Sequence, residues 1–235
     1  MPIVPLSHMF AEPARRYIEA HGGAVITGAA VKLRIEDDRR ITAAGPAQSW
    51  TAAHVISAVP WFALPELFDT PPAAFADTIA RARATASSAI VTVNLWFDRE
   101  VMEEPFIGLP GRVMQWAFDK RAVWGEGDHG ASHVSLVSSG ANSLLRLENQ
   151  ALIRIAHDEM LAALPAVRGA KLLRASVIRE PHAGFSVAPG QPARPATRTG
   201  IPGFFLAGDW IDTGLPGTIE SAVRSGRMAA EAVLQ

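Results

Sequence analysis

The chain has 235 residues, of which 49% are hydrophobic, so it is long enough to bury a sizeable core in one large domain or two small ones. Its net charge of −1 argues against a nucleic-acid partner, because such a partner normally requires a basic patch. The absence of cysteine excludes disulfides, thiolate metal sites and a cysteine nucleophile.

The N-terminal sequence MPIVPLSHMF lacks the charged start and the long apolar stretch of a signal peptide. No apolar run in the sequence reaches the length that is needed to cross a bilayer. Together with the lack of cysteine, this predicts a cytoplasmic location and leaves peripheral membrane contact open.

The N-terminal third predicts one helix followed by several short strands. The helix begins at Glu12-Pro13 and ends before Gly22-Gly23. A short strand is predicted over 24–27, and strict alternation of apolar and polar residues over 31–36 predicts a half-buried strand. Two further short runs lie within 40–51, and the apolar run HVISAV over 54–59 predicts a strand that ends at Pro60.

The central part of the chain predicts an antiparallel sheet with one long helix. Short helices are expected at 61–67 and 75–83, strands at 89–97, 113–119, 133–138 and 172–179, and a long helix from 142 or 143 to 164. The segment 181–202 is rich in proline and glycine and predicts an irregular connection to the last elements of the chain.

The C-terminal segment 204–235 predicts a strand, a loop and a helix. Residues 204–207 form a short apolar run that suits a buried strand, and Gly208 and Asp209 end it. Thr218 is a suitable N-cap for the following helix. The apolar positions at helical spacing, which we expect to face the core, are Ile219, Ala222, Val223, Gly226, Ala230 and Val233.

This unit places an acid beside a helix N-terminus. Asp209, at the carboxyl end of the strand, can accept hydrogen bonds from sugar-like hydroxyls. The amides at 218–220 carry partial positive charge and suit an electron-rich group. An ordinary crossover between strand and helix is the alternative interpretation.

This segment contains the motif LAGDW-x-DTGLPGTIE-x-A-x-SG. The motif resembles the C-terminal flavin-binding signature of the flavin-containing amine oxidase and phytoene desaturase superfamily. Within that superfamily it most resembles the bacterial squalene-associated branch, the hydroxysqualene dehydroxylases. The resemblance implies that Asp209 holds the ribityl chain of FAD and that Gly217 to Ile219 face the N1/C2=O edge of the flavin. Val31 would contact the adenine through its backbone. The residues that the resemblance assigns to the cofactor are Val31, Gly208, Asp209, Leu215, Pro216, Gly217, Thr218 and Ile219.

The fold implied by the resemblance is a mixed α/β fold in two domains. Residues 1–83 and 200–235 would form part of an FAD-binding parallel-sheet domain, and 84–199 an inserted substrate domain with an antiparallel sheet and a helix. Full-length members begin with a strand, a G-x-G-x-x-G turn and a helix that cradle the pyrophosphate, and this chain does not begin so. We therefore expect weak FAD binding, or none, by this chain alone. We also expect an N-terminal FAD-binding half on a separate chain or in a missing segment, or self-association into a homo-oligomer.

The resemblance implies an FAD-dependent oxidoreductase that acts on a long apolar isoprenoid, either squalene or hydroxysqualene or a carotenoid-like molecule. Two alternatives remain: a non-catalytic half of a split flavoprotein, or a remnant, that binds a lipid or a partner, and an amine oxidase. No catalytic residue is assigned, because the flavin itself performs the redox chemistry in such enzymes. His129 and His133 have the spacing of metal ligands on a helix, but the glycines around them argue against a helix, and no metal site is expected.

Overall fold

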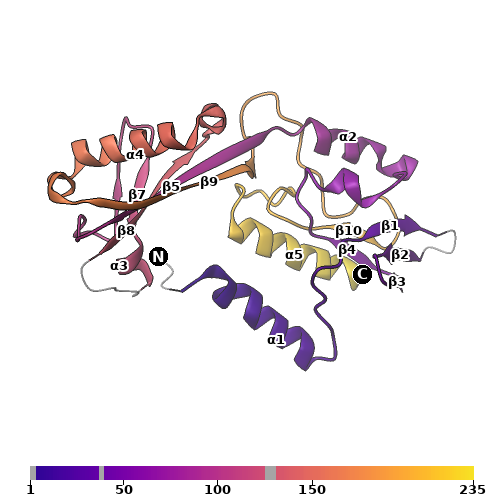
Figure 1. Ribbon diagram of the computed structural model, residues 1–235. Coiled ribbons are helices and arrows are strands. Elements are labelled where there is room, and N and C mark those ends of the chain that lie inside the picture. The colour runs from indigo at the N-terminus through magenta and orange to yellow at the C-terminus, as the bar shows by residue number, and fades with distance from the viewer. Residues whose placement is uncertain (1–3, 37–39, 125–130) are drawn as a thin grey trace. The chain divides into compact units, whose positions relative to one another are not determined.

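The computed structural model describes residues 4–36, 40–124 and 131–235, and it divides into two compact units (Figure 1). The first unit comprises residues 1–25 and 88–183, and the second comprises residues 26–87 and 184–235.

The first unit is built on a five-stranded sheet with the strand order β6-β7-β8-β5-β9. The strands are β5 (Ser87–Phe97), β6 (Phe106–Gly108), β7 (Trp116–Asp119), β8 (Ser132–Ser139) and β9 (Leu172–Phe185). Strands β6, β7, β8 and β5 pair antiparallel, as the β-branched and aromatic sequence of β5 predicts. The buried hydrophobic residues of the long strand β5 lie at every second position from Ala89 to Phe97, so one face of the sheet forms the core.

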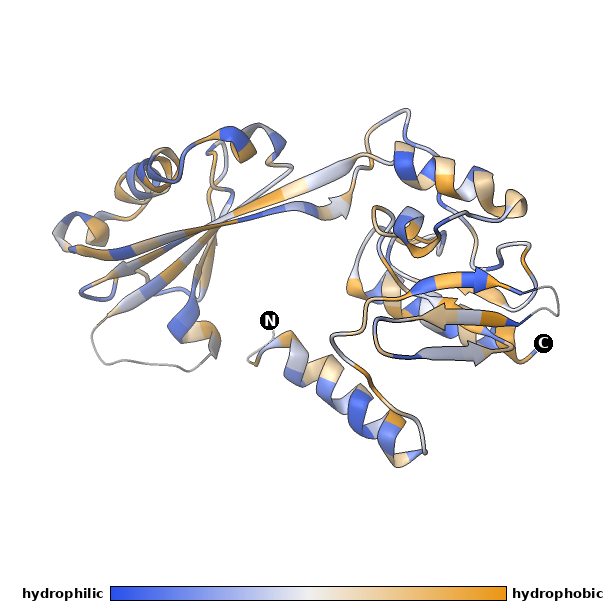
Figure 2. Cartoon of the chain, turned by 45° about the vertical axis from the view of Figure 1, so that its right-hand side comes forward, coloured by the Kyte–Doolittle hydropathy of each residue, from blue (hydrophilic) through white to orange (hydrophobic). Residues whose placement is uncertain are grey.

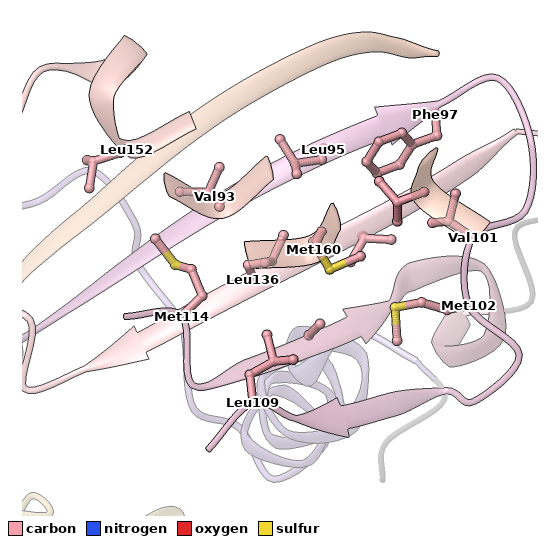
Figure 3. Packing of buried hydrophobic residues seen from close by; sticks show 14 of the residues in the cluster. Val93, Leu95, Phe97, Val101, Met102, Leu109, Met114, Leu136, Leu152 and Met160 are labelled. Carbon is pink, nitrogen blue, oxygen red and sulfur yellow. The ribbon is translucent and has the colours of Figure 1, made fainter. Parts of the chain in front are cut away.

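Helix α4 (Asn149–Ala163) covers that face of the sheet. Its buried residues Leu152, Ala156 and Met160 lie at the spacing that the sequence predicted. Figure 3 shows Leu152 and Met160 among side chains of the sheet, including Val93 and Leu95. Each large side chain buried in this way contributes about 1.5–3 kcal/mol to folding.

The remaining helices of the first unit are short. They are η1 (Ser7–Ala11), α1 (Glu12–Ala20), α3 (Lys120–Trp124), η4 (Asn142–Arg146) and η5 (Pro165–Gly169). Helix α1 has no buried residue, although it contains both hydrophobic and hydrophilic residues (Figure 2). The predicted helix over 12–21 is confirmed, but its large apolar side chains face solvent, with Tyr17 and Ile18 exposed by 67% and 41%.

The second unit contains a two-stranded parallel sheet and a three-stranded antiparallel one. Strands β4 (Val55–Ser57) and β10 (Phe204–Leu206) pair parallel, while β1 (Lys32–Ile35), β2 (Ile41–Ala44) and β3 (Ser49–Ala52) form an antiparallel meander. The helices are η2 (Leu64–Leu67), η3 (Ala73–Phe75), α2 (Ala76–Ala84) and α5 (Ile219–Val233). Phe68, Phe75 and Phe204 pack edge to face in the core of this unit.

Several predicted elements differ from the structure. The long helix predicted from 142 or 143 to 164 is instead η4 followed by α4, because the backbone of Leu147 and Glu148 between them is extended. Strand β9 continues to Phe185, into the segment that was predicted to be irregular from 181. The predicted strand over 24–27 is wrong: these residues are irregular, because a strand requires a hydrogen-bonded neighbour and no described strand pairs with them. The predicted helix over 61–67 is only a 3-10 turn at Leu64–Leu67, with Pro65 inside it. In the portion of the chain that the structure describes, no helix is both long and apolar enough to span a membrane.

Candidate functional site

The candidate site lies in the second unit, where β10 passes through a loop into α5. Strand β10 is fully buried, as its apolar sequence predicts. Gly208 follows it with φ +130°, a conformation that favours glycine. The Gly208 amide donates to Ser225 Oγ at 2.8 Å, so the end of the strand is fixed to the middle of α5.

Helix α5 begins as the sequence predicts. The Thr218 hydroxyl accepts a hydrogen bond from the Ser221 amide at 3.2 Å, which confirms Thr218 as the N-cap. Gly217, Thr218, Ile219 and Glu220 are all exposed. The start of this helix therefore presents its positive dipole end to any group that approaches.

The buried face of α5 is not the one that the sequence predicts. The buried residues are Ser221, Ser225, Ala229 and Ala232. Ile219 and Val223, which were expected in the core, are exposed by 50% and 58%. Small side chains let the helix approach β10 closely, and the serine hydroxyls bond to backbone atoms that would otherwise be buried without partners.

The Ser221 hydroxyl connects the helix to the loop that precedes it. It donates to the Asp209 carbonyl at 3.2 Å and lies 2.7 Å from the Thr213 hydroxyl. Thr213 Oγ1 in turn accepts from the Leu215 amide at 3.3 Å. These bonds hold the loop from Asp209 to Leu215 against the first turns of α5.

Asp209, Gly217 and Phe185 meet at the mouth of this loop. A Cβ atom on Gly217 would lie 2.7 Å from Phe185 Cε1 and 3.4 Å from Asp209 Oδ2. The Asp209 carboxylate is therefore beside the amino end of α5, as the sequence predicts. Gly217 is required there because any side chain would collide with the Phe185 ring.

Two residues of the proline-rich segment, Arg194 and Pro195, contact the loop from Asp209 to Leu215. Arg194 Nη1 donates to the Leu215 carbonyl at 2.7 Å, and Arg194 Nη2 lies 3.6 Å from Asp212 Oδ1. The Pro195 carbonyl accepts from the Asp212 amide at 2.9 Å. Sequence reasoning assigned no role to Phe185 or Arg194, because the segment that contains them has no periodicity from which a contact could be inferred.

A cavity of about 330 Å³ lies against this segment. Phe185 and Trp210 supply aromatic walls, and Arg81, Gln191 and Arg194 supply polar groups. The Arg194 guanidinium lies 5.6 Å from the centre of the Phe185 ring, a cation–π contact. Trp210 is 3% exposed and donates from its indole nitrogen to the Val59 carbonyl at 3.1 Å, so this wall is rigid.

The structure brings together Gly208, Asp209 and the five assigned residues from Leu215 to Ile219. Val31 is half-buried, in the same unit, immediately before the first paired residue of β1. Its contact with adenine stays a prediction. Of the two histidines considered for metal, His129 lies outside the described residues. Among the residues that are described, no cluster of three or more histidine and acidic side chains has the geometry to hold a metal ion.

The arrangement fits a cofactor that combines hydroxyl groups with an electron-rich edge. A half-buried carboxylate accepts hydrogen bonds from hydroxyls, and amides at a helix start stabilise negative charge. The Asp209 carboxylate and the start of α5 both follow the carboxyl end of the parallel strand β10. Ligands of open α/β sheets bind at this edge.

Comparison with known proteins gives three principal likenesses. The sequence matches the family described as flavin containing amine oxidoreductase over residues 10–234. Hydroxysqualene dehydroxylase of Sinorhizobium fredii is 32% identical over 151 residues, which cover 64% of this chain and 33% of that protein. The 15-cis-phytoene desaturase of an Oncidium hybrid cultivar is 27% identical over 164 residues, which cover 66% of this chain and 28% of that protein.

Among solved structures, putrescine oxidase bound to putrescine superposes with a TM-score of 0.69 at 15% identity, covering 96% of this chain and 53% of that one. At that identity the likeness shows the fold alone, and it confirms the predicted class, a mixed α/β fold that corresponds to about half of the solved chain. The chain spans about one third of the curated relatives that it matches.

Proposed function

The chain belongs to the flavin-containing amine oxidoreductase family, and we propose that it is the C-terminal portion of an FAD-dependent oxidoreductase that acts on a long apolar isoprenoid. The observation that carries the proposal is the placement of the Asp209 carboxylate beside Gly217 and the exposed start of α5. The relatives named hydroxysqualene dehydroxylase and phytoene desaturase support an isoprenoid substrate.

Each residue of the site has a separate role in this proposal. Asp209 accepts hydrogen bonds from the ribityl hydroxyls, and the amides at the start of α5 stabilise negative charge on the N1/C2=O edge. Gly208, Leu215 and Pro216 set the conformation of the loop between β10 and the start of α5. Phe185 and Trp210 exclude water from one side of the loop. FAD, when bound, supplies the redox chemistry.

We also propose a polypeptide partner that completes the cofactor site. In the described residues, β4 is hydrogen-bonded to β10 along one edge, and no strand pairs with its other edge. Ile56, in the middle of β4, is 42% exposed, and α5 exposes Ile219 and Val223. Parallel sheets are normally larger and covered on both faces. A strand–G-x-G-x-x-G–helix segment, on a separate chain or the same one, would cover these residues and supply the pyrophosphate cradle.

The glycines Gly125, Gly127 and Gly130 have the spacing of that turn, and they are not assigned to the cradle. They lie outside the described residues, and the element that follows them is strand β8 instead of a helix. The cradle requires a helix N-terminus directed at the phosphates.

The test is a titration of the 235-residue chain with FAD, alone and co-expressed with an N-terminal half that carries the strand–G-x-G-x-x-G–helix segment. We expect weak binding alone and retention of a flavin absorbance band through gel filtration in the pair. Asp209→Ala should weaken binding by about 10- to 100-fold, the effect of about 1.5–3 kcal/mol for hydrogen bonds to a charged group. Glu231→Ala, which removes an acid that is 55% exposed near the far end of α5, is the control.

Equal FAD affinity in Asp209→Ala and in the unaltered chain would refute the ribityl assignment. If the pair forms and binds no flavin, the second hypothesis holds: a non-catalytic module that binds a partner or a lipid. An amine oxidase is the remaining candidate, and turnover of a diamine instead of an isoprenoid by the flavin-loaded pair would favour it.

A further inference from the structure

Strand β6 lies at the edge of the five-stranded sheet of the first unit. It pairs with β7 on one side, and no strand in the described residues pairs with its other side. The Asp119 amide donates to the Pro105 carbonyl at 2.9 Å, so the backbone at Pro105 faces β7. Backbone groups alternate between the two sides of an antiparallel strand, and the amides and carbonyls of Phe106 and Gly108 are therefore directed away from β7.

This free edge is short and accessible. Phe106 is 45% exposed, and Gly108 is exposed as well. Pro110 is the next residue in the same alternation, but proline has no amide to donate. The edge therefore offers the donors and acceptors of two residues, which suits a short extended segment and not a long ladder.

A cavity of about 680 Å³ adjoins β6 on the side of the sheet that α4 covers. Ile107, between the two outward-facing residues, lines the cavity together with Met102 and Leu164. Ile107 pairs with Ala117, which is buried in the core beneath α4, so both side chains point to that side of the sheet. A residue placed opposite Ile107 on an added strand would direct its side chain into this cavity.

The lining of this cavity is acidic. It contains the carboxylates of Glu100, Glu103 and Glu104 and no basic side chain. Arg121 lies 3.1 Å from the Glu100 carboxylate, but it also lies 3.0 Å from the carboxylate of Asp119. One guanidinium thus serves two acids, and the exposed Glu103 and Glu104 keep their negative charge.

Other bases in nearby segments do not reverse this charge. Arg99 is paired with Asp98 at 3.2 Å. Arg168, on η5, and Lys120, beside Arg121 at the start of α3, are not part of the lining. Even when both are included with Arg121, the acids outnumber the bases, and charge complementarity favours a positively charged occupant.

We propose that the edge of β6 binds an extended, basic segment of a partner protein as an added antiparallel strand. Antiparallel pairing continues the pattern of β6 and β7 and is the more stable arrangement per residue. The residues opposite Phe106 and Gly108 exchange backbone hydrogen bonds with them, and the residue opposite Ile107 places an apolar side chain in the cavity.

The direction of the added strand fixes where its basic residues lie. An antiparallel segment runs toward the N-terminal end of β6, so its third and fourth residues after the apolar one lie beside Glu104 and Glu103. Lysine or arginine at these two positions meets the acidic end of the edge. This interaction is additional to the proposed oxidoreductase function.

The test is an NMR titration of the flavin-free, isotopically labelled 235-residue chain with the acetylated and amidated peptide TVTSKK. NMR detects the weak binding that is expected of a six-residue peptide, and it reports the site. We expect saturable shifts of the Phe106 and Gly108 amide signals. The peptide TVTSEE, in which glutamate replaces both lysines, should bind at least about tenfold more weakly because its charge repels the acidic lining.

N-methylation of the peptide tests the backbone pairing. Methyl groups on both threonine amides, which would face Phe106 and Gly108, should weaken binding by at least about tenfold, since each removes a hydrogen-bond donor. A methyl group on the valine amide, which is directed away from β6, is the matched control. It should leave the affinity within about twofold of that of TVTSKK.

A variant of the chain tests the charge argument. Glu103→Gln combined with Glu104→Gln should weaken TVTSKK binding by about three- to tenfold, the effect of losing two exposed ion pairs. The same variant should bind TVTSEE no more weakly than the unaltered chain does. Glu180→Gln, at an exposed position of β9 in the same unit, is the control and should leave both affinities unchanged.

Absence of binding at millimolar TVTSKK would overturn the proposal. Equal affinities for TVTSKK and TVTSEE, or for the two kinds of N-methylated peptide, would overturn it as well. If co-expression with the N-terminal half blocks the peptide, the edge belongs to that half and the assignment to a separate partner is wrong. Because FAD takes no part in this titration, its failure is distinguishable from a failure of the flavin titration.

Discussion

Ser225 allows a sharp test of how the end of β10 is fixed to α5. Its side chain is fully buried, at 0% exposed, and its hydroxyl accepts from the Gly208 amide at 2.8 Å. The same hydroxyl donates to the Ala222 carbonyl at 2.7 Å. In Ser225→Ala the Gly208 amide loses its acceptor, and an unsatisfied buried donor costs about 1–3 kcal/mol.

The lower part of that range applies here, because Gly208 is only half-buried and water can reach its amide. We expect the free energy of unfolding to fall by about 1–2 kcal/mol with an unchanged urea slope. Hydrogen exchange at Gly208 should accelerate by roughly 5- to 30-fold, the same free energy expressed as a rate ratio. Ser49→Ala, at an exposed position of β3, is the control and should change stability by less than about 0.5 kcal/mol.

The assay is urea unfolding followed by tryptophan fluorescence, to which Trp210, buried in the same unit, is one of six contributors. A midpoint for Ser225→Ala equal to that of the Ser49→Ala control would refute the reasoning. So would unchanged hydrogen exchange at Gly208, because the loss is assigned to that single amide.

Three further predictions concern Gly217, Arg194 and Asp98. Gly217→Ala should destabilise the fold by about 1–3 kcal/mol through collision with the Phe185 ring, and a double-mutant cycle with Phe185→Ala should recover most of that loss in urea unfolding. Arg194→Met should accelerate hydrogen exchange of the 212–217 loop by about fivefold, or about 1 kcal/mol, whereas Arg198→Met should leave it unchanged. The neighbouring guanidinium and a backbone amide hold the pKa of Asp98 below its ordinary value of 3.8, so the stability that Asp98 contributes is present above that value and is lost as the pH falls through the lower folded pKa. Asp98→Asn should therefore lower the urea midpoint at neutral pH. In strong acid, the urea midpoints of Asp98→Asn and of the unaltered chain should be equal.

The sequence predicted the elements whose pattern is local. Alternation identified β1, β-branched and aromatic composition identified β5, helical spacing identified α4 with its buried Leu152, and Thr218 marked the start of α5. The motif also predicted the position of Asp209 at the end of the strand.

The remaining features depend on contacts between distant residues. Phe185 and Gly217 are 32 positions apart, and no periodicity relates them. The buried face of α5 was predicted wrongly because hydrophobic spacing favours Ile219 and Val223, whereas the close approach to β10 selects Ser221 and Ser225. The strand predicted at 24–27 failed for a related reason, since strand formation depends on a neighbour that the local sequence cannot specify.

Docking of a partner segment on the exposed apolar residues of the second unit should be thermodynamically coupled to FAD binding at the proposed cofactor site. Ile56, Ile219 and Val223 remain exposed on the two elements, β4 and α5, that adjoin the flavin loop. A segment that docks on them and also contacts FAD makes the two binding events interdependent, since each stabilises the arrangement that the other requires. Linkage then demands that FAD strengthen docking by the same factor by which docking strengthens FAD binding. Measuring the factor on the reconstituted pair tests this: a factor well above one supports one shared site, and a docking affinity indifferent to FAD would place the partner away from the cofactor.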